Sequence, residues 1–188
     1  MSRFEHLSVL ISIILGLGIA QLLTNVHGIV QARPRVRSYW LAWVWAGLIF
    51  VAQVEWWWSS FGFQDLPLEH WTFFYFLFIL LSPVTLYLAA ASALPDAVHG
   101  ESVDLRAFYY RRKGWFFTMA ALGPAFDAVR RGLTSGNPMD VGVVTNVMAA
   151  LLVGSLGLTD RESYHGVLTL AITALFLYFI LSAVLTLH

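Results

Sequence analysis

The sequence of 188 residues contains no cysteine and a single lysine, Lys113. Without cysteine the chain forms no disulfide, thiolate metal site, thiol nucleophile or cysteine-ligated haem or iron–sulfur cluster. The lysine stands beside arginines in a polar stretch, which excludes a pigment held as a Schiff base by a membrane-embedded lysine. Gly-rich phosphate loops, the nucleophile elbow and HExxH are also missing, which points away from a conventional enzyme but leaves open one built from scattered residues.

Charged residues are scarce as well. They make up 12% of the chain and hydrophobic residues 59%, whereas soluble domains have roughly 25% and 45–50%. The formal net charge is zero and no long basic run is present, so we expect no nucleic-acid partner. This composition excludes a soluble domain and predicts an all-α integral membrane protein whose main partner is the lipid bilayer.

Six apolar segments have the length and composition of membrane-spanning helices. We find no convincing internal repeat and no linker between them. We therefore expect residues 1–188 to form one domain, a six-transmembrane-helix bundle. The six segments are 7–30, 39–58, 71–94, 115–131, 137–159 and 166–187.

The segment 115–131 is the weakest of the six. Its uncharged run is short and is interrupted by a Gly-Pro pair before Asp127. A run this short is compatible with re-entry on one side, which gives the alternative of five crossings plus one re-entrant segment around 115–131. We prefer six crossings, because the sequence from Lys113 to Trp115 is typical of an interfacial anchor and the stretch to Gly132 is long enough with tilt.

Basic residues set the expected orientation of the bundle. Six crossings place most of them on one side, namely Arg33, Arg35, Arg37, Arg106, Arg111, Arg112, Lys113 and Arg161, and leave Arg3, Arg130 and Arg131 on the other. The positive-inside rule then puts the first group in the cytoplasm and both termini on the non-cytoplasmic side. With five crossings, the C-terminus lies inside instead.

Small residues recur at four-residue spacing in two segments. The segment 7–30 has a ridge at Ser8, Ser12, Gly16, Ala20, Thr24 and Gly28. The segment 137–159, whose start is indicated by Asn137 before a proline, has a stripe at Gly142, Asn146, Ala150 and Gly154. Such surfaces let two helix backbones approach closely. We therefore expect the first segment to be central in the bundle and to pack against the fifth.

Two carboxylates, Glu55 and Asp127, lie inside the ends of apolar segments, where each must be paired, protonated or hydrated. One interpretation is structural. Asp127 then pairs with Arg130 or Arg131, three and four residues further along the helix, and Glu55 pairs with either arginine across helices. The functional interpretation is that one or both carboxylates line a proton or cation path.

Four amide side chains also fall within the apolar segments. They either line a water-filled path or hydrogen-bond between helices as packing contacts, and the second role is the more common. The four are Gln21, Asn25, Gln53 and Asn146.

The six histidines fall three at each expected membrane surface. No signature spacing among them indicates haem or zinc, although a pair such as His27 with His165 is geometrically allowed. We expect interfacial histidines, no catalytic residue, and no cofactor or metal site. The outer group is His6, His70 and His188, and the inner group is His27, His99 and His165.

Three stretches carry a resemblance to known proteins: FEHLSVLISIILGLGIAQLL at 4–23, YYRRKGWFF at 109–117 and RESYHGVL at 161–168. In these the chain loosely resembles a group of small bacterial proteins with six membrane spans and no assigned activity. The resemblance implies six crossings and the bacterial cytoplasmic (inner) membrane. It implies no site residue.

Two functions remain open at this point. The first is an ion or proton channel or transporter, which we expect to be a homo-oligomer because six short helices enclose little space. The second is a non-catalytic membrane component that binds a membrane-protein partner, lipid or quinone. Glu55 and the amides favour the first, while the aromatic-rich third segment and the triplet Trp56-Trp57-Trp58 favour the second.

Overall fold

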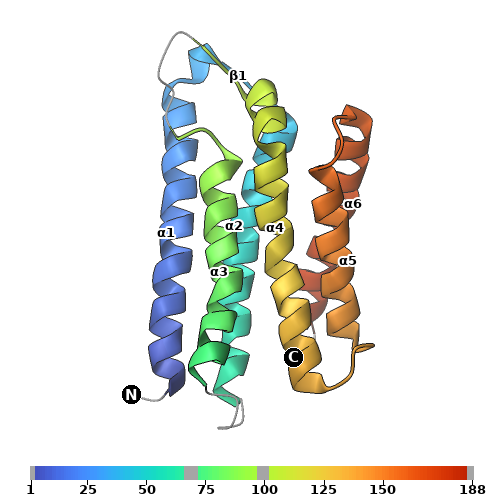
Figure 1. The fold of residues 1–188 in the computed structure, drawn as a ribbon. Coiled ribbons are helices and arrows are strands. Elements are labelled where there is room, and N and C mark those ends of the chain that lie inside the picture. The colour runs from blue at the N-terminus through green and yellow to red at the C-terminus, as the bar shows by residue number, and fades with distance from the viewer. Residues whose placement is uncertain (1–2, 66–71, 97–101, 186–188) are drawn as a thin grey trace.

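The computed structural model describes residues 3–65, 72–96 and 102–185, and these residues form an all-α bundle (Figure 1). The predicted six helices are confirmed in this part of the chain. They are α1 (Arg3–Gln31), α2 (Trp40–Ser59), α3 (Phe73–Ala93), α4 (Leu105–Ser135), α5 (Val141–Leu156) and α6 (Glu162–Leu185). Two short 3-10 helices, η1 (Arg33–Arg35) and η2 (Ser60–Asp65), and two short strands, β1 (Val36–Arg37) and β2 (Val103–Asp104), lie in the connections.

Aspartate caps fix the starts of α4 and α5. Asp104 accepts hydrogen bonds from the backbone N–H groups of Arg106 at 2.8 Å and Ala107 at 3.1 Å. The bond from Ala107 is the main cause that holds the pKa of the Asp104 carboxyl below its usual range. Asp140 caps α5 in the same way. The prediction that Asn137 starts this helix is therefore wrong, since Asn137 lies in the turn before the cap.

Successive helices run in opposite directions (Figure 1). At one end of the bundle α1, α3 and α5 finish and α2, α4 and α6 begin. We call this the β end, because β1 and β2 pair there in parallel, Val36 with Val103 and Arg37 with Asp104. The other end, here the N-terminal end, carries the start of α1 and the turn between α4 and α5.

Two clusters of buried side chains fill the bundle. The larger joins α2, α3 and α4 toward the β end, where the rings of Trp45 and Phe117 meet edge to face with centroids 4.9 Å apart. The smaller lies toward the N-terminal end and contains Leu7 and Ile11 of α1 with Trp56 of α2. Each of α1, α2 and α3 contributes buried residues to both clusters.

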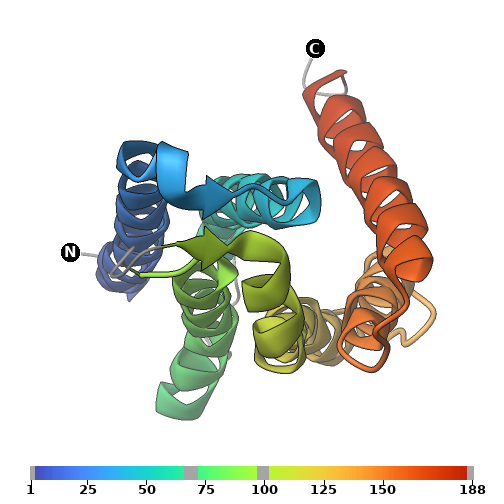
Figure 2. The same cartoon turned by 90° about the horizontal axis from the view of Figure 1, so that it is seen from above.

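α1 lies at one edge of the bundle and packs against α2 and α3 (Figures 1 and 2). The prediction that it is central is wrong. Its small-residue ridge is open at Gly16 and Gly28, since nothing lies within 4 Å of a Cβ placed at either glycine, while Ser12 of the ridge accepts a hydrogen bond from Trp57 Nε1 of α2 at 3.0 Å. The packing face is instead the row of buried residues Leu7, Ile11, Leu15, Gly18, Leu22, Asn25 and Ile29, whose spacing is that of a heptad seam.

α5 packs against α4 and, less extensively, α6. The predicted contact between α5 and α1 is therefore wrong. A Cβ at Gly154 would lie 3.6 Å from the Ala121 Cβ of α4. The small residues of α5 do allow a close helix contact, but with the helix that precedes it in the chain.

The segment 115–131 lies within α4, one continuous helix that contains Pro124 in its interior. A re-entrant segment reverses direction within itself, whereas α4 extends from the β end to the opposite end (Figure 1). The segment around 115–131 therefore has the continuous helical form expected for six crossings and shows no reversal.

Three helices in the described part of the chain are long and apolar enough to cross a membrane: Phe4–Gln31, Phe73–Ala93 and Glu162–Leu181. α5 is apolar but shorter, with 16 residues. α6 is the outermost helix and leans away from the other five (Figure 2). Within residues 162–181 its buried side chains are His165 and Thr169. Long apolar helices with exposed apolar faces are consistent with a membrane protein.

Candidate functional site

The predicted polar residues do not form one continuous row through the bundle. Gln21 and Asn25 lie in the half of α1 nearer the β end, and Gln53 lies between α1 and α2. Glu55, Asp127, Arg130 and Arg131 lie toward the N-terminal end, on α2 and α4.

Asn25 joins α1 to the end of α3. Its side chain is 1% exposed, accepts a hydrogen bond from Gln21 Nε2 at 2.9 Å, and donates from Nδ2 to the Leu94 carbonyl at 3.1 Å. Nδ2 also lies 3.4 Å from Asp96 Oδ1. Since the Leu94 carbonyl directly follows α3, the amide satisfies a backbone group that the helix leaves without a partner. Of the two roles considered for the amide side chains, Asn25 therefore has the hydrogen-bonding role between helices.

Gln53 is fully buried and faces Gly18. Its Nε2 donates to the Ile49 carbonyl at 3.4 Å, while its Oε1 has no hydrogen-bond partner among the described residues. Any side chain at position 18 would collide with this amide. Position 18 is therefore occupied by glycine because the Gln53 amide of α2 and the backbone of Tyr87 on α3 both lie against it.

The four ionisable residues near the N-terminal end form what we call the carboxylate cluster: Glu55, Asp127, Arg130 and Arg131. Arg130 Nε lies 3.2 Å from Asp127 Oδ1, and the two side chains are 14% and 18% exposed. The Arg130 guanidinium also lies 4.9 Å from the centroid of the Phe63 ring. The predicted pairing of Asp127 with an arginine on its own helix is seen here as a largely buried ion pair.

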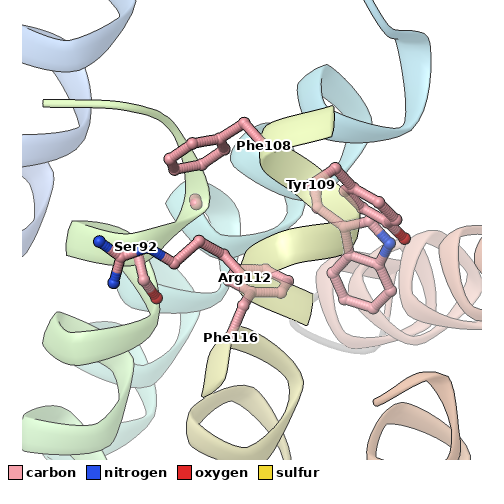
Figure 3. Close-up of a pocket in the computed structure, with 7 residues that line it drawn as sticks. Ser92, Phe108, Tyr109, Arg112 and Phe116 are labelled. Atoms are coloured by element: carbon pink, nitrogen blue, oxygen red, sulfur yellow. The ribbon is translucent and has the colours of Figure 1, made fainter. Parts of the chain in front are cut away.

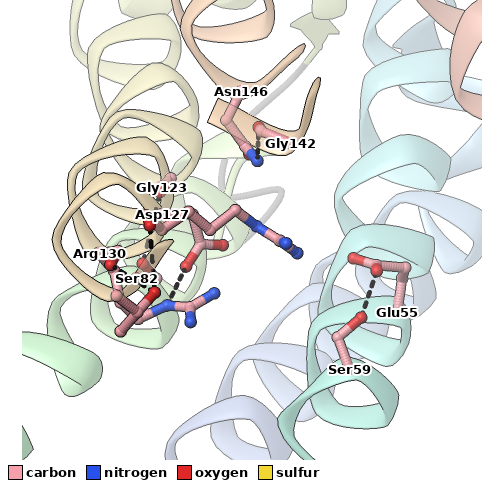
Figure 4. A network of polar contacts seen from close by, with 10 residues as sticks. Glu55, Ser59, Ser82, Gly123, Asp127, Arg130, Gly142 and Asn146 are labelled. Carbon is pink, nitrogen blue, oxygen red and sulfur yellow. Dashed lines mark hydrogen bonds and ion pairs between the residues drawn. The ribbon is translucent and has the colours of Figure 1, made fainter. Parts of the chain in front are cut away.

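Glu55 stands on α2 opposite this pair (Figure 4). It accepts a hydrogen bond from Ser59 Oγ at 2.5 Å, and no arginine lies within ion-pair distance of it in the described part of the chain. The predicted ion pair of Glu55 with Arg130 or Arg131 is therefore wrong. Asp127 and Arg131 act on Glu55 electrostatically with opposite signs, which places the three charges in one region.

Two further predicted residues, Arg131 and Asn146, lie at or on α5. A Cβ at Gly142 would lie 3.1 Å from Arg131 Nη1, so the arginine side chain passes directly over this glycine. Asn146 donates from Nδ2 to the Gly142 carbonyl at 2.8 Å (Figure 4). Asn146 is therefore hydrogen-bonded within its own helix.

A second polar site at the β end was not predicted. His165 of α6 has no exposed surface, its Nδ1 lies 2.8 Å from the Tyr109 hydroxyl, and its Nε2 lies 2.9 Å from the Thr159 carbonyl. Since a carbonyl only accepts, Nε2 carries the proton and Nδ1 accepts from the Tyr109 hydroxyl. His165 lies at the β end near the start of α6, as its predicted place at the inner surface requires, but aromatic rings of α4 cover it.

Further hydrogen bonds join this histidine site to α2. The Tyr39 hydroxyl lies 3.2 Å from the Tyr110 hydroxyl and donates to Glu162 Oε1 at 3.3 Å. Arg106 Nη2 lies 2.8 Å from the other Glu162 oxygen. The starts of α2, α4 and α6 are therefore tied together by polar contacts around buried aromatic rings.

The residues of this site come mainly from the stretches 109–117 and 161–168, whose sequences predicted basic residues, an interfacial anchor and an interfacial histidine but no contact between the two stretches. Tyr109 and His165 are 56 positions apart, so no local spacing connects them. The sequence feature that could have indicated this site is the pair of tyrosines in the first stretch together with Glu162 and His165 in the second.

A hollow of about 200 Å³ opens between α3 and α4 at the β end. Ser92, Asp96 and Arg112 supply its polar groups, and Phe108 and Trp115 supply aromatic walls. Figure 3 draws a smaller neighbouring pocket that shares Ser92, Phe108 and Arg112 with this hollow, and in it the Arg112 side chain extends from α4 toward Ser92 of α3.

No protein family, curated protein or solved structure matches the chain. In the described ranges no three His, Asp or Glu side chains gather closely enough to hold a metal ion. Inferences about function therefore depend on the geometry of the carboxylate cluster, the histidine site and the hollow.

Proposed function

We propose that the chain is an integral protein of the bacterial inner membrane that crosses the bilayer with all six helices. The three long apolar helices α1, α3 and α6 support this, as does the apolar α5. Exposed side chains along α6 are large and apolar, among them Leu170, Leu175, Leu177 and Phe179. In water such a surface is unfavourable, whereas in lipid it is not.

In this proposal the β end faces the cytoplasm. Eight arginine and lysine residues belong to this end and three to the other: Arg33, Arg35, Arg37, Arg106, Arg111, Arg112, Lys113 and Arg161 against Arg3, Arg130 and Arg131. The positive-inside rule then places both termini on the non-cytoplasmic side.

For activity, we propose that the protein passes protons or cations as a homo-oligomer. One observation carries this proposal: Glu55 is an ionisable side chain on α2, a helix proposed to cross the membrane, and among the described residues its hydrogen-bond partner is only Ser59. Asp127 is neutralised by Arg130, which leaves Glu55 as the carboxylate able to bind a passing cation or exchange a proton. The exposed outer helix α6 offers a surface on which a second copy can associate.

The experiment compares ion flux into liposomes for the wild-type protein, Glu55→Gln and Asp160→Asn. Asp160 is a matched control, because it is an exposed carboxylate at the opposite end, paired with Lys113 at 2.8 Å. We expect an imposed voltage to drive flux through the wild type and the control, and Glu55→Gln to lower it about tenfold or more. The mass of the detergent-solubilised protein checks the oligomer.

The wild type decides between the two candidate functions. If it passes neither protons nor cations under an imposed gradient, the transport proposal fails. If Glu55→Gln instead unfolds, Glu55 is structural and the proposal again loses its basis.

The second candidate is a non-catalytic membrane component that binds lipid, quinone or a membrane-protein partner. The hollow between α3 and α4 favours it, because polar and aromatic groups meet there at the expected membrane surface. Neither candidate requires a resident cofactor.

A further inference from the structure

The hollow between α3 and α4 carries opposite charges that do not pair with each other. Arg112 has no hydrogen-bond or ion-pair partner among the described residues, and Asp96 accepts only the long bond from Asn25. Ser92 donates to the Leu88 carbonyl at 2.8 Å, so its lone pairs remain able to accept. A ligand with one positive and one negative group would satisfy both charges.

Polar and apolar groups of the hollow lie at different depths. α4 begins at the β end, so Trp115 lies about 4.5 Å further along the helix axis than Arg112. α3 ends there, so Leu88 lies about 6 Å deeper than Ser92. Trp115 is 51% exposed and borders the outer surface of the bundle. On each helix a polar group thus lies nearer the β end than Leu88 or Trp115, and Phe108 and Leu94 line the hollow beside the polar groups. This order matches an amphiphile whose head points toward the β end.

We propose that this hollow binds the head group of an aminophospholipid of the phosphatidylethanolamine type. The lipid phosphate pairs with Arg112, the primary ammonium pairs with Asp96, and the acyl chains follow Leu88 and Trp115 into the bilayer. Charge-assisted hydrogen bonds of this kind are about twice as strong as neutral ones. The proposal rests on the proposed membrane insertion and is independent of ion flux.

The arrangement of charges selects among lipid head groups. Asp96 repels a head group that carries only the phosphate charge, such as phosphatidylglycerol. A choline head group has a positive charge but no N–H to donate to the carboxylate. A primary ammonium has both the charge and the donors, so it is the complement of Arg112 with Asp96.

The experiment measures bound lipid by native mass spectrometry and thermal stability of the detergent-purified protein. Phosphatidylethanolamine, phosphatidylcholine and phosphatidylglycerol with identical acyl chains are added in separate titrations. The variants are Arg112→Gln and Asp96→Asn, and the second keeps an oxygen that accepts from Asn25. Arg111→Gln is the matched control, because Arg111 is the neighbouring arginine on α4 and does not line the hollow.

We expect one phosphatidylethanolamine per chain, bound at least about tenfold more tightly than the other two lipids. Arg112→Gln and Asp96→Asn each abolish this preference, and Arg111→Gln retains it. Equal binding of phosphatidylglycerol or phosphatidylcholine, no effect of Asp96→Asn, or no retained lipid overturns the proposal. Loss of the protein from alkali-washed membranes would instead disprove membrane insertion, and absent ion flux would affect only the transport proposal.

Discussion

At the scale of single residues, the buried polar side chains of the bundle differ in how fully they are hydrogen-bonded. Both ring nitrogens of His165 have partners, whereas Gln53 keeps an acceptor without one in the described chain. A satisfied buried group stabilises one packing arrangement, while an unsatisfied one lowers the stability of its surroundings. The histidine site therefore stabilises the packing of the helices at the β end.

This interpretation predicts that His165→Leu destabilises the fold by about 2 kcal/mol. Leucine removes the acceptor of the Tyr109 hydroxyl and leaves that donor buried among aromatic rings. The Thr159 carbonyl is less affected, because Lys113 Nζ donates to it at 2.7 Å. Equilibrium unfolding in mixed detergent micelles, followed by circular dichroism, measures the loss.

His27→Leu is the control for this change. His27 is exposed on α1 and contacts Gln31 of the same helix, so its replacement should leave unfolding nearly unchanged. Equal stability of the two variants would show that the hydrogen bond between Tyr109 and His165 contributes nothing to stability and that the histidine site does not stabilise the β end.

The carboxylate cluster and the histidine site show which residue contacts can be predicted from sequence. Asp127 and Arg130 are three positions apart on one helix, so their pairing was predictable. The environment of Glu55 and the contact between Tyr109 and His165 depend on how separate helices are placed. No spacing within one helix encodes that placement, and both were predicted wrongly or missed.

At the scale of elements, α1 illustrates why helices were easier to predict than their packing faces. Apolar residues surround the whole helix, so hydropathy identifies its length but not which side is buried. Two rows of small or apolar residues competed, one through Gly16 and one through Gly18. The second is the buried row, in which Gly18 lies against Gln53 of α2 and the backbone of Tyr87 on α3, whereas Gly16 is open.

We predict opposite effects for leucine at these two glycines of α1. Gly18→Leu should destabilise the protein by about 2 kcal/mol or more, since the new side chain collides with Gln53 and with the backbone at Tyr87. Gly16→Leu should change stability by less than about 0.5 kcal/mol, because the position is open. Detergent unfolding curves of both variants test this.

A reversed order of these two variants would restore the small-residue ridge as the packing surface. It would then require α1 to be covered on its outward face, for example by another copy of the chain in the membrane.

At the scale of the whole molecule, the up-and-down order of the helices makes the proposed topology testable. The chain has no native cysteine, so a single introduced cysteine reports on one position. In intact cells we predict that a cysteine at Ser135 reacts with an impermeant thiol reagent, while one at Ser38, Ser102 or Ser163 does not. All four positions are exposed in the structure.

Permeabilised cells provide the control for this experiment, since all four cysteines should then react. Labelling of Ser163 from outside would contradict six crossings even though α4 is continuous. Labelling of Ser38 and Ser102 with protection of Ser135 would invert the proposed orientation.

The small parallel pairing of β1 with β2 has a mechanical consequence for the bundle. It fastens the connection after α1 to the connection before α4, and Arg37 adds an ion pair to Asp104 at 3.8 Å. The described part of the N-terminal end has no paired strands. The β end is thus held by a strand pairing in addition to helix packing. Glu55 and the Asp127–Arg130 pair lie at the opposite end, where in the described residues helix packing and turns alone join the helices.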